Sequence, residues 1–394
     1  MLFDPSRHEP LTELAWDESR ARAAIADIVA RTEAAFDDQE LWHAHPLDLE
    51  DGPLNRVASL YLGASGVIWA LHTLERGGAT ELGRDWSVVA TSLAEAYPTT
   101  PDFQDILDGP VPSLWMGEAG ILLVAHALAP ATWQEVRLLA AVHANAANPS
   151  WELMWGSPGT MLAAQVMYER TGDERWRDAW SISADRLWDE WRDDLWLQNL
   201  YGKPLHILGP AHGFAGNVLV LARGDLLDPA RRSELERRAI ATLTRHAERA
   251  DGLAQWSPSL EPSSKERRTQ WCHGAPGIVA SLAALAPGDE ELGELLLAGG
   301  ALTWQAGPLR KGANLCHGTA GNGYAFLKLH ERTGDELWLE RARAFAMHAI
   351  EQVDVATARY GRGRHSLWTG DPGTALYLQG CLTATSVFPT LDRF

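Results

Sequence analysis

Cysteine is scarce in this sequence, which has only three among 394 residues, Cys272, Cys316 and Cys381. Three cysteines do not form the paired framework of a disulfide-rich secreted protein, and a reducing compartment would keep them as free thiols. Thiolates are therefore available as metal ligands or nucleophiles.

Long apolar runs are also missing. No stretch of about 18 apolar residues that could span a bilayer occurs, and the first eight residues, MLFDPSRH, lack the apolar segment of a signal peptide. Leu2 stands where N-myristoylation requires glycine. These absences predict a cytoplasmic protein with no membrane partner.

Positive charge is in the minority, with 34 lysine and arginine residues against 52 aspartate and glutamate residues and a net charge of −18. A general nucleic-acid binder, or a protein that binds anionic membranes, needs a positive field around it. Both classes are therefore excluded as the main function, although a local basic patch is compatible with this composition.

β-strand patterns are sparse too, because polar residues seldom alternate with β-branched ones. What recurs instead, at spacings of about 40 to 60 residues, is the tetrapeptide Gly-x-x-Gly, seven times, beginning at Gly63, Gly117, Gly156, Gly213, Gly274, Gly318 and Gly370. An apolar stretch follows each copy, and a more amphipathic stretch of helical periodicity precedes it. The amphipathic stretches are 18–36, 85–96, 132–146, 175–192, 229–249, 290–304 and 336–354. Each unit predicts an outer helix, a glycine loop and an inner helix.

The segment ERTGDE supports this repeat because it occurs twice, in the third and the sixth units. In each copy we expect the glycine, Gly172 or Gly334, to end a helix in the left-handed conformation. The aspartate that follows, Asp173 or Asp335, is expected to cap the N-terminus of the next helix.

The repeats predict an all-α protein. The inner helices are apolar on most sides and need neighbours all round, which favours a closed ring over an open solenoid. We therefore expect a single domain over residues 1–394, an α/α toroid (barrel) of seven inner and seven outer helices. Apart from the stretch 18–36, residues 1–50 are not placed by this scheme. The polar stretch 257–268 is expected to be a surface loop beside the site.

In such a toroid all seven glycine loops gather at one end of the ring, where the N-termini of the inner helices carry partial positive charge. Glycine suits loops that crowd together, and a positive φ is a second reason for it. Three loops have histidine before the first glycine, and two of these have cysteine one position earlier. These residues are His212, His273, His317, Cys272 and Cys316. The reactive groups therefore occupy one arc of the mouth.

The two cysteines, with one or more of the three histidines, match a zinc site of thiolates and imidazole. Three protein ligands and a fourth position open to water or substrate are typical of catalytic zinc. Cys316 and His317 are adjacent, so they can converge on one ion only from a loop. A buried, inert cysteine is the alternative for any single thiol, and it is our interpretation of Cys381, inside the last inner helix.

Aromatic residues precede the glycines of the other loops. They are Tyr61, Trp115, Trp155 and Trp368. We expect these large side chains to pack the ring rather than to recognise a substrate, although they would line the mouth in either case.

The segments around the cysteines and histidines resemble motifs of the lanthionine synthetase C-like (LanC-like) family. WCHGAPG at 271–277 and CHGTAGNGYAFL at 316–327 resemble the family's two zinc-ligand motifs, and GPAHGFAG at 209–216 resembles its histidine motif. The resemblance covers the seven repeats and implies the same α/α toroid of seven inner and seven outer helices.

The resemblance also implies a site and a reaction. Zn²⁺ would be held by Cys272, Cys316 and His317, and His212 would act as a catalytic acid or base, with His273 as the other candidate for the acid. The reaction would add a thiol to the β-carbon of a dehydroalanine or dehydrobutyrine residue in a peptide or protein, giving a thioether. Zinc suits this reaction because it holds the nucleophile as a thiolate at neutral pH, and a nearby acid can protonate the developing enolate carbon.

One branch of the family is favoured. His273 stands where cyclising bacterial synthetases usually have tyrosine, and this resembles the LanC-like proteins that use glutathione. In that branch Lys311 would contact glutathione or a leaving phosphate; otherwise it is a solvated surface lysine. A kinase or dehydratase acting upstream would be the partner that supplies the dehydroamino acid.

Two further residues follow from the resemblance. Glu152 occupies the position of an acidic residue near the metal, and the alternative is a carboxylate at the end of a helix or loop. Arg268 matches an active-site arginine of the cyclases, and the alternative is that it belongs to the general charge of its loop. Both are kept as candidate catalytic residues.

Three other functions stand as alternatives. A lanthipeptide cyclase would use cysteines of its own substrate as the thiol, and a non-catalytic adaptor would bind zinc or a thiol on the same ring. A carbohydrate-active α/α toroid needs a facing pair of carboxylates. The glycine loops supply thiols and imidazoles instead, which disfavours the third alternative.

Overall fold

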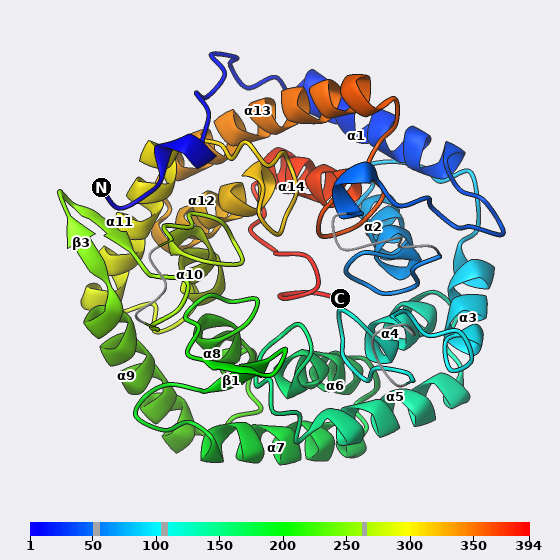
Figure 1. The fold of residues 1–394 in the computed structure, drawn as a ribbon, viewed down its shortest axis with the longest axis horizontal. Coiled ribbons are helices and arrows are strands. Elements are labelled where there is room, and N and C mark those ends of the chain that lie inside the picture. Colours follow the sequence, from blue (N-terminus) through cyan, green and yellow to red (C-terminus); the bar gives the residue numbers. More distant parts are fainter. Residues whose placement is uncertain (50–55, 104–108, 262–265) are drawn as a thin grey trace.

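The computed structural model describes residues 1–49, 56–103, 109–261 and 266–394. Over these ranges, fourteen α-helices form two concentric layers around one axis (Figure 1). The inner helices are α2 (Ala64–Arg76), α4 (Glu118–Leu128), α6 (Ser157–Thr171), α8 (Phe214–Ala222), α10 (Ala275–Leu282), α12 (Thr319–Thr333) and α14 (Asp371–Thr383). The outer helices are α1 (Glu18–Ala34), α3 (Ser87–Ala96), α5 (Thr132–Asn145), α7 (Glu174–Asp189), α9 (Pro229–His246), α11 (Glu290–Ala306) and α13 (Glu336–Tyr360). The predicted all-α toroid of seven inner and seven outer helices is confirmed.

The ring closes because its inner helices are buried on every side. In α4 every residue from Ala119 to His126 is buried, and a helix that is apolar all round needs neighbours in all directions. The first outer helix, α1, packs against the last inner helix, α14. No helix within the described ranges is both long and apolar enough to cross a membrane.

The helix ends in the two ERTGDE segments lie where the sequence places them. Gly172 and Gly334 follow α6 and α12 with φ of +66° and +69°. The carboxylates of Asp173 and Asp335 each accept a hydrogen bond from the backbone N–H two residues on, at the starts of α7 and α13. These caps fix where the chain turns from the inner to the outer layer.

Close backbone approach explains the second glycine of the tetrapeptide. A β-carbon at Gly120 would lie 2.0 Å from the carbonyl oxygen of Leu114, and one at Gly277 would lie 1.8 Å from that of Trp271. Positive φ is a lesser reason, since Gly274, at +103°, is the only one of the seven first glycines that has it. Crowding of the loops is therefore the main requirement.

We expect the variant Gly120→Ala to lower the free energy of unfolding by about 2–4 kcal/mol, because the new methyl group would overlap a backbone carbonyl that cannot move away. Thermal or urea denaturation followed by circular dichroism measures the change. Gly288→Ala is the matched control, since a β-carbon there meets nothing within 4 Å. Equal midpoints for the two variants would contradict the crowding explanation.

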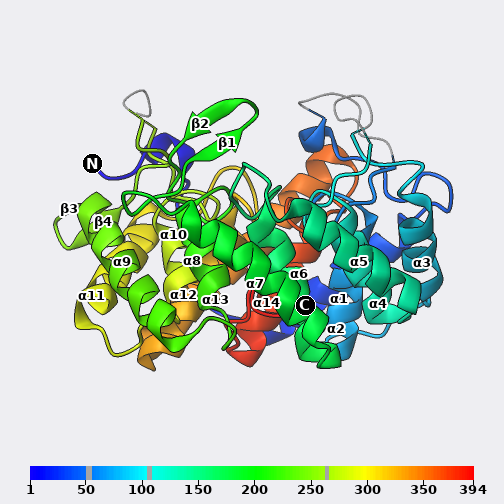
Figure 2. The same cartoon turned by 90° about the horizontal axis from the view of Figure 1, so that it is seen from below.

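Two short antiparallel hairpins interrupt the helices. They are β1 (Gln198–Leu200) with β2 (Lys203–Leu205), and β3 (Glu248–Ala250) with β4 (Leu253–Gln255). Their two-residue turns, Tyr201-Gly202 and Asp251-Gly252, have positive φ at both positions, which is the geometry of a type I′ turn. Asp-Gly is a recognisable turn pattern, whereas Tyr-Gly is not. Figure 2 shows the β1–β2 hairpin standing beyond the helices at one end of the ring.

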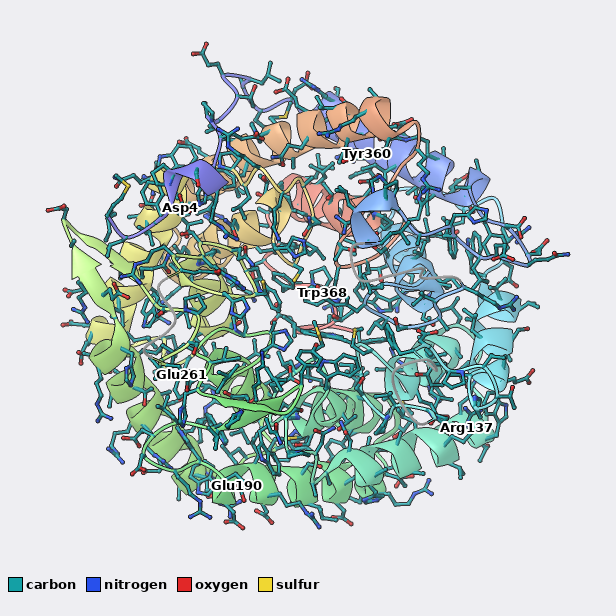
Figure 3. All side chains as sticks on the ribbon, in the orientation of Figure 1. Asp4, Arg137, Glu190, Glu261, Tyr360 and Trp368 are labelled. Carbon is teal, nitrogen blue, oxygen red and sulfur yellow. The ribbon has the colours of Figure 1, made fainter. Side chains whose placement is uncertain are left out.

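Aromatic side chains fill the axis of the ring. Trp368 lies near the centre of Figure 3, with its ring centroid 4.4 Å from that of Trp115 and 4.8 Å from that of Trp271. The ring of Tyr61 stacks on Trp368 at 5.8 Å. These contacts agree with the packing role expected for Tyr61, Trp115 and Trp368.

The segment after α14, coloured red in Figure 1, enters the middle of the ring. Phe388 packs there against Trp271 and Trp368, with centroid distances of 5.1 and 5.7 Å. Asp392 forms an ion pair of 2.7 Å with the ammonium group of Lys328, whose side chain is buried. The C-terminal segment therefore supports the aromatic cluster, and through it the loops that carry the cysteines.

Candidate active site

Backbone hydrogen bonds join neighbouring glycine loops at equivalent positions. The N–H of Cys272 donates to the carbonyl of Cys316 at 3.0 Å, and the N–H of Cys316 donates to that of Trp368 at 2.9 Å. The same bond links Trp368 to Tyr61 and Tyr61 to Trp115. The two cysteines therefore lie side by side because they occupy the same place in adjacent repeats.

A tight turn presents Cys272. Gln270 and His273 pair through two backbone hydrogen bonds, of 3.1 and 3.0 Å, and Cys272 lies at the turn between them. Gly274 follows with φ of +103°, and a β-carbon there would lie 2.0 Å from the carbonyl oxygen of Arg268. Only glycine can follow the Cys-His pair in this conformation.

The ligand atoms of Cys272, Cys316 and His317 all lie within 4.8 Å of one another. Tetrahedral zinc with Zn–S bonds of about 2.3 Å requires about 3.8 Å between donor atoms, so small side-chain shifts suffice to meet it. Burial, and then the charges of Lys311 and Arg364, lower the pKa of His317 to about 3. The imidazole is therefore neutral and able to coordinate, and the donor set fits Zn²⁺ with one position open.

The sulfur atoms of Cys272 and Cys316 share a hydrogen bond, which shifts the pKa values of the two thiols in opposite directions. This bond to Cys316, opposed by burial, lowers the pKa of Cys272 to about 7, and a bond from Gln270 and the charge of His212 act in the same direction. The same shared bond, with burial, raises the pKa of Cys316. The hydroxyl of Tyr61 also hydrogen-bonds to Cys316. One thiolate thus forms readily here, which favours a cation.

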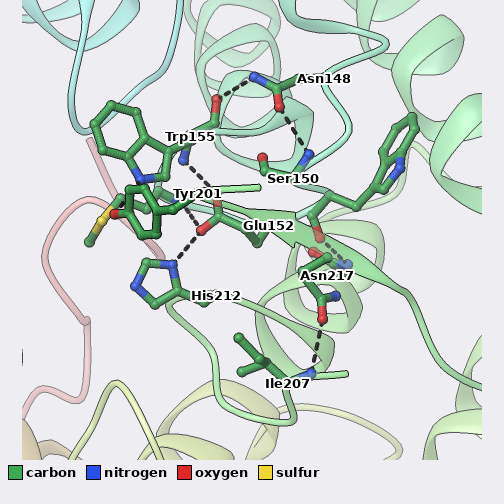
Figure 4. A network of polar contacts seen from close by, with 11 residues as sticks. Asn148, Ser150, Glu152, Trp155, Tyr201, Ile207, His212 and Asn217 are labelled. Carbon is green, nitrogen blue, oxygen red and sulfur yellow. Dashed lines mark hydrogen bonds and ion pairs between the residues drawn. The ribbon is translucent and has the colours of Figure 1, made fainter. Parts of the chain in front are cut away.

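Glu152 and His212 form a pair in which the carboxylate is buried and the imidazole is partly exposed (Figure 4). The carboxylate of Glu152, with no exposed surface, accepts hydrogen bonds from the N–H groups of Met154 and Trp155 at 2.9 and 2.7 Å. It also lies 2.9 Å from Nδ1 of His212. Burial acts to lower the pKa of His212, but the hydrogen bond and charge of Glu152 outweigh it and raise the pKa. Nε2 is then the nitrogen left for proton exchange.

His273 has the opposite character. Its ring stacks near that of His212, with 6.1 Å between centroids. Burial, and then the charges of His212 and Arg268, lower the pKa of His273 to about 3. Its Nδ1 is buried and hydrogen-bonds to no other residue in the described ranges. Of the two candidates for the acid, His212 is the one whose pKa is raised, so it is the better proton donor near neutral pH.

A cavity of about 1430 Å³ opens over the site. His317 and Tyr61 lie on its wall, so it reaches the ligand triad. Basic residues line it, namely Arg310, Lys311, Arg359 and Arg364, and so do aromatic residues, namely Phe103, Trp155, Tyr201 and Tyr360. The wall therefore offers positive charge and apolar surface at once.

The other two predicted site residues, Lys311 and Arg268, differ in their relation to the cavity. Lys311 is exposed to the cavity, and its charge reaches Cys316 and His317. Arg268 pairs with Glu266 at 2.5 Å, and its charge lowers the pKa of Cys272 and of His273. Residues 262–265 of the predicted surface loop 257–268 lie outside the described residues.

Sequence reasoning missed two parts of this site. The helix α13 runs to Tyr360, beyond the predicted end at residue 354, and carries Arg359 into the cavity wall. The first fifty residues also contribute, because Asp48 pairs with Arg364 on the wall. Gly361, in the left-handed conformation with φ of +70°, is the pattern that marks the true helix end.

Comparison with known proteins agrees with the motifs. A model of the lanthionine synthetase C-like protein family matches residues 58–392. LanC-like protein GCL1 of Arabidopsis thaliana is 34% identical over 144 residues, which are 35% of this chain and 32% of that protein. Glutathione S-transferase LANCL1 of Danio rerio is 35% identical over 141 residues, which are 33% of this chain and 32% of that protein. The aligned segments thus span about a third of each relative.

Among solved structures, nisin cyclase superposes with a TM-score of 0.61 over 92% of this chain and 94% of that chain, at 16% sequence identity. At this identity the likeness shows the α/α toroid alone. Because the family model extends over most of the sequence, from the first glycine loop to the C-terminal segment, the chain belongs to the lanthionine synthetase C-like family.

Proposed function

We propose that this protein is a zinc-dependent enzyme that adds a thiol, glutathione or a similar small thiol, to dehydroalanine or dehydrobutyrine residues in peptides or proteins. The observation that carries the proposal is the triad of Cys272, Cys316 and His317 beside the Glu152–His212 pair. A three-ligand set leaves one position for a substrate, and the imidazole of His212, whose pKa is raised by Glu152, is the candidate acid. The relative from Danio rerio named glutathione S-transferase supports a small thiol as the co-substrate.

In this reaction the thiolate sulfur attacks the β-carbon of the dehydroamino acid and a C–S bond forms. The electron pair of the C=C bond moves toward the carbonyl, and the α-carbon then takes a proton. Zinc, when bound, keeps the attacking thiol ionised at neutral pH. His212 supplies the proton from Nε2, because Glu152 holds Nδ1 and stabilises the protonated ring.

The cavity wall suits two substrates of different character. Lys311 and Arg310 would pair with the carboxylates of glutathione, or with a phosphate leaving during formation of the double bond. Trp155 and Tyr201, whose rings contact each other on the same cavity wall, would bind apolar side chains of the peptide. Arg268 would add positive charge beside Cys272. We place the reaction in the cytoplasm, with a dehydratase acting upstream to form the dehydroamino acid, or a kinase acting upstream to install the phosphate whose elimination forms it.

Incubation of the zinc-loaded protein with a dehydroalanine peptide, with and without glutathione, tests the proposal by product mass. We expect a mass gain equal to one glutathione, only when glutathione and protein are both present. A peptide that carries its own cysteine tests the cyclase alternative, in which free thiol disappears without a mass change. Neither adduct nor ring under zinc-replete conditions would exclude both activities and leave a non-catalytic adaptor.

A further inference from the structure

The N-terminal segment, which has no place in the repeat, lies against the loop that precedes the second cysteine motif. The N–H of Arg310 donates to the carbonyl of Arg7, and the N–H of Glu9 donates to that of Pro308, each at 3.0 Å. His8 is thereby paired in antiparallel fashion with the loop. The backbone around Arg7 is fixed at the edge of the site.

A second anchor joins this segment to α13. The carboxylate of Glu9 accepts a hydrogen bond from Nε2 of Gln352 at 2.7 Å and lies 2.9 Å from Nε2 of His348. The N–H of Thr12 donates to Nδ1 of His348 at 3.2 Å. Since Nδ1 accepts, the proton of this imidazole is on Nε2 and points at Glu9. The segment is therefore held at Arg7 itself and at Glu9 and Thr12, which follow it.

Arg7 reaches the first zinc-ligand motif through one side chain. Its Nη2 donates to Oε1 of Gln270 at 3.2 Å, and Nε2 of Gln270 donates to Sγ of Cys272 at 2.9 Å. A guanidinium group can only donate, so it must face the amide oxygen and leave the amide NH₂ facing the sulfur. Arg7 therefore sets the orientation of the Gln270 amide.

The turn at residues 270–273 does not require the side-chain amide of Gln270. The backbone bonds between Gln270 and His273 form the turn whatever side chain Gln270 carries. Gln270 is nevertheless buried, with only 4% of its surface exposed, and a buried amide is costly unless both of its ends are hydrogen-bonded. Both contacts of this amide lead to the site, one to Arg7 and one to the sulfur.

We infer that Gln270 is a positioning residue for the Cys272 sulfur and that Arg7, in the N-terminal segment, holds Gln270 in place. The inference rests on the proposed metal-dependent function. The hydrogen bond fixes the direction of the sulfur and withdraws part of its negative charge. Partners of metal ligands commonly change metal affinity or activity by about 10- to 100-fold when they are removed.

Cobalt(II) in place of zinc is the probe, because the thiolate-to-cobalt charge-transfer band reports the charge on sulfur without any substrate. In Gln270→Leu we expect this band to move to longer wavelength, since the sulfur lone pair is no longer stabilised, and zinc affinity to fall by about 10- to 100-fold. In Arg7→Leu the same changes should be smaller. The double variant should match Gln270→Leu alone, because Arg7 acts through Gln270.

Arg22→Leu is the matched control, because Arg22 is exposed on α1 and pairs only with the nearby Glu18. Arg7→Lys keeps a donor and should restore part of the Arg7→Leu change. If Gln270→Leu does not fold, Arg7→Leu still decides the question, since Arg7 lies in a half-buried surface segment. An unshifted band and unchanged affinity, with cobalt bound at the wild-type stoichiometry, would overturn this inference alone. A wild-type protein that binds neither metal would overturn it together with the proposed function.

Discussion

Cys272→Ala and Cys316→Ala are each expected to abolish zinc binding and, with it, thiol addition. Each variant leaves two of three protein ligands, which is too few to hold the ion at a site with one open position. The loss should exceed the roughly 100-fold effect of removing a partner of a ligand. Metal analysis of the purified protein should give one zinc per chain for the wild type and none for either variant.

Cys381→Ala is the matched control for these variants. Cys381 is buried in α14, and burial raises the pKa of its thiol to about 12. Its sulfur is therefore a packed, protonated group, and the variant should keep one zinc per chain. Zinc retained in Cys272→Ala, or lost in Cys381→Ala, would contradict the ligand assignment.

The architecture was predictable because the same sequence pattern occurs in all seven units. Seven glycine pairs, each forced by close backbone approach, mark the same point in every unit, so the inner and outer helices could be placed between them. Stacking of consecutive repeats then places Cys272 beside Cys316, since residues at equivalent positions of adjacent repeats are neighbours. The approximate location of the site follows from these two facts.

What could not be predicted lies outside the repeat. Arg7 touches Gln270 across 263 positions in the sequence, and neither residue belongs to a periodic pattern. The position of Phe388, in the C-terminal segment, was equally unpredictable, because this side chain packs in the ring axis against Trp271 and Trp368. Such contacts depend on the shapes of particular side chains, and the spacing of residues in the sequence does not predict them.

Protonation states were equally hidden from the sequence. His212 and His273 each precede a first glycine and look alike in their motifs. The buried carboxylate of Glu152 raises the pKa of the first, while burial without such a partner lowers that of the second to about 3. Which histidine can act as the acid therefore depends on one residue from a different repeat.

Replacing His212 by alanine is expected to lower kcat for thiol addition by about two to four orders of magnitude, the usual contribution of a positioned acid or base. Zinc content should stay at the wild-type value, because the triad of Cys272, Cys316 and His317 does not include this residue. Single-turnover kinetics with a dehydroalanine peptide, together with metal analysis, measure both quantities. His206→Ala is the matched control, since His206 pairs with Glu261 at 3.2 Å outside the cavity.

The pH dependence makes this prediction sharper. A histidine that donates a proton is active in its protonated form, so the rate should fall as the pH rises through the pKa of His212, which lies above its ordinary value. Glu152→Gln removes the charge that raises this pKa, and the falling limb of the profile should move to lower pH while zinc remains bound. The amide oxygen can still accept a hydrogen bond from the N–H of Trp155, but the N–H of Met154 loses its carboxylate acceptor, so metal analysis and thermal denaturation accompany the pH profile as controls for folding. A limb that stays in place in Glu152→Gln, or that disappears in His273→Ala but not in His212→Ala, would show that His212 is not the acid.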